Sequence, residues 1–135
     1  MTTARDFIRF APGLQADVRR LDAMGAIRDA LRSSDDLRKP EWRGHPHPMA
    51  GHCYVASEAL WHVLGGMQSE WRPEVLDAGT CKHWYLRSKR TRLVLDVTGD
   101  QFEAQPPYEN GRGRGFLTKQ PSKRAAELIK RACLD

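Results

Sequence analysis

The residues best suited to chemistry are a cysteine, a histidine and an aspartate that occur in that order along the chain. Cys53 follows a glycine and a histidine, His83 precedes a tryptophan, and Asp96 lies thirteen positions after His83. Cysteine-based acyl transfer needs a thiolate, a histidine that pairs with it and shuttles protons, and a carboxylate or amide that orients this histidine. The three residue types therefore predict a catalytic triad of Cys53, His83 and Asp96.

The cysteine is predicted to lie at the start of a helix. Apolar residues recur at helical spacing between Cys53 and Val63, and Gly65-Gly66 follows as a stop signal. At the first turn of a helix, unpaired backbone N–H groups and the helix dipole favour a thiolate. The same N–H groups are suited to form half of an oxyanion hole.

The histidine and the aspartate are predicted to face each other across a hairpin. Alternating residues predict strands over 82–87 and 92–97, joined by a polar turn over 88–91. A turn centred on Lys89 and Arg90 places His83 directly opposite Asp96, on one face of the strand pair. Side chains paired in this way can share a hydrogen bond, so this register supports the triad.

The rest of the chain is predicted to supply helices and connections around this centre. Apolar spacing predicts a helix over 14–32, and Ser122 is a candidate N-cap for a last helix that ends near Cys133. The connections are predicted over 33–48, 68–80 and 105–118, the second with a short strand near Val75. The order predicts one α+β domain over 1–135, with an N-terminal helical segment, a catalytic-type core and a C-terminal helix over 1–39, 40–121 and 122–135.

Composition indicates an ordinary globular domain. The 135 residues are 40% hydrophobic and 29% charged, and no apolar run approaches the length of a membrane span. The first residues lack the apolar core of a signal peptide, so a cytoplasmic protein with no membrane partner is expected. Three cysteines at irregular spacing argue against a disulfide framework, and we expect reduced thiols. The oligomeric state is left open.

A pattern of short motifs spans about residues 40 to 125. It consists of Trp42, Pro48-Met49-Ala50-Gly51-His52-Cys53, Gly65-Gly66, His83-Trp84-Tyr85 and Asp96-Val97-Thr98-Gly99-Asp100-Gln101-Phe102. This pattern resembles the YunG-like proteins, which are small bacterial and phage proteins. The order of Cys, His and Asp also resembles the transglutaminase-like and papain-like cysteine enzymes. The resemblance implies their fold, in which a helix with the cysteine at its N-terminus packs on an antiparallel sheet that carries His and Asp.

Three more residues are candidates for substrate binding or for an oxyanion donor, namely His52, Trp42 and Gln101. Trp42 and Gln101 also have a structural interpretation. Trp42 can pack its loop on the core, and Gln101 can satisfy backbone groups after the strand. Likewise, a single cysteine on a central helix is often a small buried apolar residue. The combination of the three triad residues favours the catalytic interpretation.

The leading functional hypothesis is a cysteine hydrolase or acyltransferase that needs no cofactor or metal. It would cleave an amide, isopeptide or ester bond of a protein or peptide-like substrate through a thioester. One alternative is a zinc site drawn from the nearby His and Cys residues, although their spacing matches no CxxC-type framework. These candidate ligands are His45, His47, His52, Cys53, Cys81 and His83.

A second alternative follows from the net charge of +5. Basic residues gather over 82–92 and 112–131, which suits an acidic substrate or a nucleic acid without identifying either. The Gly-Arg repeat over 111–115 resembles nucleic-acid-binding segments, but a surface loop is the favoured interpretation. The residues of such a binding module would be Arg112, Arg114, Lys123, Arg124, Lys130 and Arg131.

Overall fold

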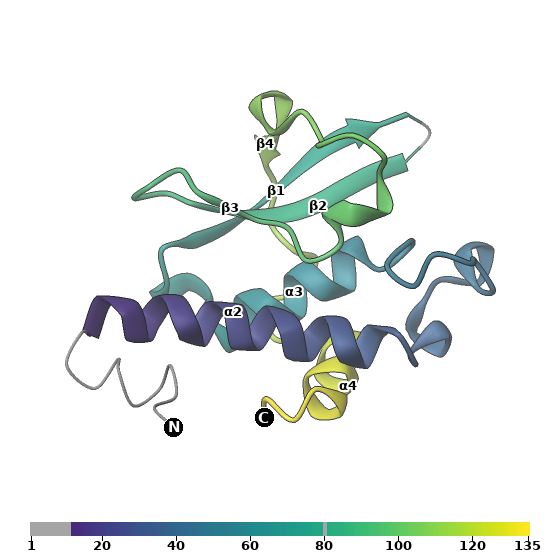
Figure 1. Cartoon of the computed structure of the whole chain (residues 1–135), viewed down its shortest axis with the longest axis horizontal. Coiled ribbons are helices and arrows are strands. Elements are labelled where there is room, and N and C mark those ends of the chain that lie inside the picture. Colours follow the sequence, from purple (N-terminus) through teal and green to yellow (C-terminus); the bar gives the residue numbers. More distant parts are fainter. Residues whose placement is uncertain (1–11, 80) are drawn as a thin grey trace, which may run out of the picture.

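The described residues of the computed structural model, 12–79 and 81–135, form three α-helices and one antiparallel sheet (Figure 1). The helices are α2 (Pro12–Leu31), α3 (Cys53–Val63) and α4 (Lys123–Arg131). The strands β1 (Trp71–Ala78), β2 (Cys81–Ser88), β3 (Val94–Leu95) and β4 (Arg112–Gly113) lie in the order β3-β2-β1-β4. The expected α+β class is thereby confirmed.

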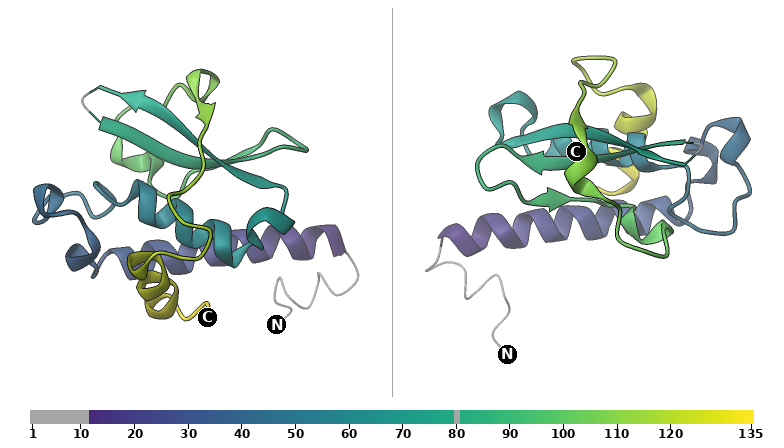
Figure 2. Two further views of the ribbon diagram at one scale, coloured as in Figure 1. Left: turned by 180° about the vertical axis from the view of Figure 1, so that it is seen from behind. Right: turned by 90° about the horizontal axis from the view of Figure 1, so that it is seen from above.

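Helix α3 lies between the sheet and the other two helices. It packs against β2 and β1 on one side and against α2 and α4 on the other (Figure 2). Every residue from Val55 to Trp61 is buried, which is typical of a helix enclosed by its neighbours rather than one with a solvent face. The position of α3 therefore places its first residue at the boundary between the helices and the sheet.

The hydrophobic core surrounds α3. Burial of its apolar side chains is the main stabilising contribution to such a fold. The members from α3 include Val55 and Leu60, and those from the other layers include Ile27 of α2, Leu86 of β2 and Leu128 of α4.

The buried carboxylate of Glu58 fixes the start of α4. It accepts hydrogen bonds from the Ser122 backbone N–H at 2.8 Å and from the Ser122 hydroxyl at 2.7 Å. Ser122 is the N-cap that the sequence predicts, and its Oγ accepts from the Ala125 N–H. The predicted bounds of α3 are also confirmed.

The strands differ from the sequence prediction in length. Strand β1 extends over eight residues, where only a short strand near Val75 was expected. Pro73 lowers the strand signal there, yet it is tolerated because β4 pairs only with Glu74 and Val75. Conversely, β3 has only two residues rather than the predicted six over 92–97.

The predicted hairpin register is wrong by two positions. The structure pairs Leu86 with Leu95 and Arg87 with Val94, so Asp96 is not directly opposite His83. Arg92 adopts a positive φ of 66°, and the longer turn shifts the pairing. A shift of two residues preserves the face on which each side chain lies, because side chains alternate with a period of two. His83 and Asp96 therefore remain on one face and meet diagonally.

The predicted connection over 105–118 also contains structure. Strand β4 lies within it, and Gly111 precedes that strand at a very close approach to β2. A Cβ atom at Gly111 would lie 1.6 Å from the Tyr85 hydroxyl oxygen, so only glycine fits. No helix in the described ranges is both long and apolar enough to cross a membrane.

Candidate active site

Cys53 is the first residue of α3, as the sequence predicts. The turn before it depends on Gly51, whose φ of +79° lies in the left-handed region that favours glycine. A Cβ atom at Gly51 would also come within 2.6 Å of the Trp42 Cβ. The N-cap residue His52 makes no side-chain capping bond, so the first N–H groups of α3 lack a partner from their N-cap.

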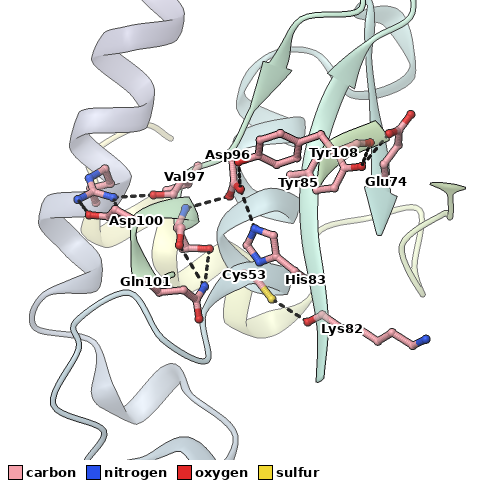
Figure 3. Close-up of polar contacts among 12 residues, drawn as sticks. Cys53, Glu74, Lys82, His83, Tyr85, Asp96, Val97, Asp100, Gln101 and Tyr108 are labelled. Atoms are coloured by element: carbon pink, nitrogen blue, oxygen red, sulfur yellow. Dashed lines mark hydrogen bonds and ion pairs between the residues drawn. The ribbon is translucent and has the colours of Figure 1, made fainter. Parts of the chain in front are cut away.

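His83 and Asp96 form a buried pair (Figure 3). The His83 Nε2 lies 2.7 Å from the Asp96 Oδ2, and the two side chains are 1% and 6% exposed. The Phe102 ring meets the imidazole edge to face, with ring centroids 4.8 Å apart. These contacts fix the plane of the imidazole and leave its Nδ1 free of the Asp96 interaction.

Cys53 lies on the other side of this imidazole (Figure 3). Its Sγ donates to the backbone carbonyl of Lys82 at 3.5 Å, which ties the thiol to the strand that carries His83. Burial lowers the pKa of His83, but its interactions with Asp96 and Cys53 outweigh this effect and raise the pKa to about 9. Transfer of the thiol proton to His83 gives an imidazolium that stabilises the negative charge on the neighbouring sulfur.

Tyr108 forms a hydrogen bond with the carboxylate of Asp96. Its hydroxyl donates to the same Oδ2 at 2.6 Å, and the Thr98 N–H donates to the Oδ1 at 3.3 Å. Burial and the charge of Asp96 raise the pKa of Tyr108, so its hydroxyl stays protonated. Sequence patterns gave no sign that Tyr108 is a partner of Asp96, because it lies in an irregular segment with no periodic signal.

A cleft of about 400 Å³ opens beside Cys53 and His83. Its volume falls within the usual range of small-molecule and peptide sites. The walls come from α3, β2, the segment before α3, the chain after β3, the chain after β4 and the first turn of α4. The lining residues outside the triad include Trp42, Tyr54, Trp84, Gln101, Phe102 and Leu117.

Of the other candidate residues, two lie at the cleft and one does not. Trp42 and Gln101 both line the cleft, as substrate-binding candidates should. However, the Gln101 amide nitrogen donates to the Thr98 carbonyl at 3.1 Å and to the Thr98 hydroxyl at 3.2 Å. Both amide N–H groups are therefore occupied, which argues against Gln101 as an oxyanion donor.

His52 is placed differently from the expectation. Its side chain is fully buried and is not among the cleft-lining residues. Neither ring nitrogen has a hydrogen-bond partner among the described residues. Burial and the nearby charges of Arg38 and Arg124 lower the pKa of His52 to about 4. A side chain held beneath the surface in the neutral form cannot contact a substrate in the cleft.

The chain contains two further cysteines, Cys81 and Cys133. Cys81 lines the same cleft at the start of β2, and burial raises the pKa of its thiol. Cys133 is exposed beyond α4, so it is a natural internal reference for thiol reactivity.

The structure gives little support to a zinc site or to a nucleic-acid-binding surface. In the part of the chain that the structure describes, no three His, Cys, Asp or Glu side chains come together as a metal site would require. In the proposed nucleic-acid surface, Arg131 is held in ion pairs with Asp36 and Glu127, and Arg124 donates to the Leu37 carbonyl.

Comparison with family models, curated proteins and solved structures finds no match to this chain. The chemistry of the site is therefore indicated by the contacts of Cys53, His83 and Asp96 themselves.

Proposed function

We propose that this protein is a cysteine-dependent hydrolase or acyltransferase that acts on an amide, isopeptide or ester bond. The observation that carries this proposal is the placement of His83 between two partners at the edge of a cleft. Its Nε2 is held at 2.7 Å from Asp96, and the opposite side of its ring faces Cys53 (Figure 3). A nucleophile, a proton carrier and an orienting carboxylate are the parts that such a reaction needs.

The first step forms a thioester. The Cys53 thiolate attacks the substrate carbonyl carbon, and the carbonyl electron pair moves onto oxygen. When the tetrahedral intermediate collapses, the bond to the leaving nitrogen or oxygen breaks, and that atom takes the Nδ1 proton of His83. Backbone N–H groups at the start of α3 are suited to stabilise the transient oxyanion.

The second step releases the acyl group. Neutral His83 removes a proton from water or from an acceptor amine, which then attacks the thioester carbonyl. The C–S bond breaks, and the Cys53 thiolate and protonated His83 are restored. Asp96 stays ionised throughout and holds the imidazole in the tautomer and orientation that both steps require.

The arrangement of α3 on the sheet also supports a cysteine-dependent enzyme. A helix that begins at the cysteine packs on an antiparallel sheet that carries the histidine, which suits a papain-like or transglutaminase-like arrangement. The motif pattern from Trp42 to Phe102 suits membership of the YunG-like proteins. Strand β3 differs from the strand expected for this arrangement, because it has only two residues before Asp96.

The test measures the reactivity of Cys53. The folded protein is treated with iodoacetamide at pH 6.5, and modification of each cysteine is followed by peptide mass spectrometry. Cys53 should react at least about tenfold faster than Cys133, because thiolates and not thiols are alkylated. H83Q should bring Cys53 down to the rate of Cys133, and K130Q is a control on the exposed face of α4. Equal rates for Cys53 and Cys133 in the unmodified chain would refute the proposal.

A second measurement tests acyl transfer directly. The protein is incubated with an activated acetyl ester, and the acyl adduct is mapped after acid quenching. The expected adduct is a thioester on Cys53 that is absent in C53S and accumulates in H83Q only slowly. Because C81S and C133S keep the proposed nucleophile, both should still form the adduct.

A further inference from the structure

The walls of the cleft carry an excess of positive charge. Among the described residues that line it, four are basic, namely Lys39, Lys82, Arg114 and Arg124, and one is acidic, namely Glu41. The whole chain is far more balanced, with 22 basic and 17 acidic residues. The positive charge is therefore concentrated where a substrate would bind.

Two of these cations are available to a ligand. The Lys82 ammonium is paired with Asp77, and one guanidinium nitrogen of Arg124 donates to the Leu37 carbonyl. In contrast, neither a carboxylate nor any other hydrogen-bond acceptor in the described ranges is paired with the charged group of Lys39 or Arg114. A cation that borders a cleft without a counter-charge favours an anionic group there.

Arg114 is held in place although no described carboxylate pairs with it. Its guanidinium lies over the Trp84 ring at 5.7 Å from the ring centroid. Its backbone N–H donates to the Pro73 carbonyl at 3.2 Å, which extends the contact between β4 and β1. The charge is thus positioned before a ligand arrives, and this lowers the entropic cost of binding.

Aromatic side chains form the apolar part of the same cleft. Tyr54 meets Trp84 edge to face with centroids 4.8 Å apart, and Trp42 and Phe102 add further apolar surface. Such walls accept the aliphatic and aromatic parts of a peptide, whereas the cations select its acidic side chains. A nucleic acid fits the charge but offers no carbonyl carbon bonded to a good acyl leaving group.

We infer that the cleft binds an acidic peptide segment, with a substrate carboxylate paired to Arg114 or Lys39 while the scissile carbonyl lies at Cys53. This inference rests on the proposed function, since it names the substrate class of the same site. It adds a specificity role for two residues that take no part in the chemistry of the triad.

The first experiment compares two alkylating reagents of similar size. Iodoacetate carries a negative charge and iodoacetamide does not, so the ratio of their rates reports the local attraction for anions. At low salt, this ratio at Cys53 should exceed the ratio at exposed Cys133 by roughly tenfold. Half-molar sodium chloride should remove most of the excess, because salt screens exposed charges.

Variants separate the cleft cations from His83, which attracts anions itself. R114Q and K39Q should each lower the iodoacetate rate at Cys53 about threefold more than they lower the iodoacetamide rate. K130Q removes a lysine outside the cleft and should change neither rate. If R114Q and K39Q leave the reagent ratio unaltered, the inference is overturned even when Cys53 reacts rapidly with both reagents.

A competition experiment tests the peptide class. A short glutamate-rich peptide should slow iodoacetamide modification of Cys53, and R114Q should weaken this protection. Equal protection by a glutamine-rich peptide of the same length would overturn the inference and leave the proposed function intact. Stronger protection by a thymidine oligonucleotide would replace the peptide with a nucleic acid. Slow alkylation of Cys53 without any competitor would instead refute the proposed function.

Discussion

At the scale of single residues, His83 depends on contacts from both sides of its ring. Asp96 accepts from its Nε2, and the same carboxylate oxygen also accepts from the Tyr108 hydroxyl. The negative charge of Asp96 is thereby shared between two donors. Tyr108 consequently acts on the chemistry only through Asp96, as a positioning residue.

Y108F tests this role. Loss of the hydroxyl leaves the carboxylate charge to His83 alone, so the pKa of His83 should rise further above its ordinary value. The unfolding free energy should fall by about 1 kcal/mol, because one buried hydrogen bond is lost. Nuclear magnetic resonance titration of the imidazole measures the first effect, and urea denaturation measures the second. An unchanged or lower pKa of His83 would contradict the assigned contact.

The His83 pair also predicts how stability varies with alkaline pH. Its pKa is about 9 in the folded chain and about 6.5 when unfolded. Its stabilising contribution is therefore complete below pH 6.5 and is lost as pH rises through 9. The loss should reach about 3 kcal/mol near pH 9 to 10 in urea denaturation. H83Q should lack this decline between pH 6.5 and 9, and an identical decline would contradict the prediction.

At the scale of elements, α3 begins with the proposed nucleophile Cys53 and continues as a buried helix. Its N-terminus faces the cleft, whereas residues 55–61 are enclosed by the sheet, α2 and α4. Although the N-cap His52 precedes the helix, its side chain is also fully buried. The charged groups that act on it are Arg38, Arg124, Asp35 and Asp36, and the arginines together with burial keep it neutral.

H52L tests the buried histidine at the start of α3. The pKa of His52 is lowered to about 4, so its neutral form favours folding above pH 6.5 and this contribution is lost as pH falls towards 4. The unmodified chain should lose up to about 3 kcal/mol over that interval. H52L should be at least as stable at pH 7, because both unpartnered ring nitrogens are removed. The acid-induced loss should then shrink, and an unchanged acid profile would contradict this account.

At the scale of the whole molecule, the candidate site forms where two layers meet. The nucleophile comes from a helix, the histidine comes from the sheet, and Asp96 follows the short edge strand β3. The cleft also draws on the segment before α3 and on the chain after β4. No single layer contains all the parts, so the reaction requires the packed domain.

I27A separates global stability from the site. Ile27 is a fully buried core residue of α2, the helix that packs on α3 away from the sheet. The change should lower the unfolding free energy by about 2 to 4 kcal/mol, because it leaves a cavity. The ratio of alkylation rates at Cys53 and Cys133 should stay unchanged under native conditions. A stability loss below about 1 kcal/mol would contradict the core position.

Local sequence signals account for the parts of the site that lie within single elements. The start of α3 at Cys53 and the Ser122 cap follow from apolar spacing and side-chain chemistry over a few residues. The shared face of His83 and Asp96 follows from strand alternation, which survives the error of two in register. These features needed no knowledge of distant segments.

Contacts between distant segments decided the rest. Tyr108 reaches Asp96 only because β4 and its flanking chain pass beside β1, and Gly111 permits the close approach to Tyr85. His52 is buried rather than directed towards the cleft, close to the charges of Arg38 before α3 and Arg124 of α4. Sequence alone determined which residues could react and where the helix bearing the nucleophile begins. Tertiary structure decided register, burial and the cations that border the cleft, since each depends on segments that meet only on folding.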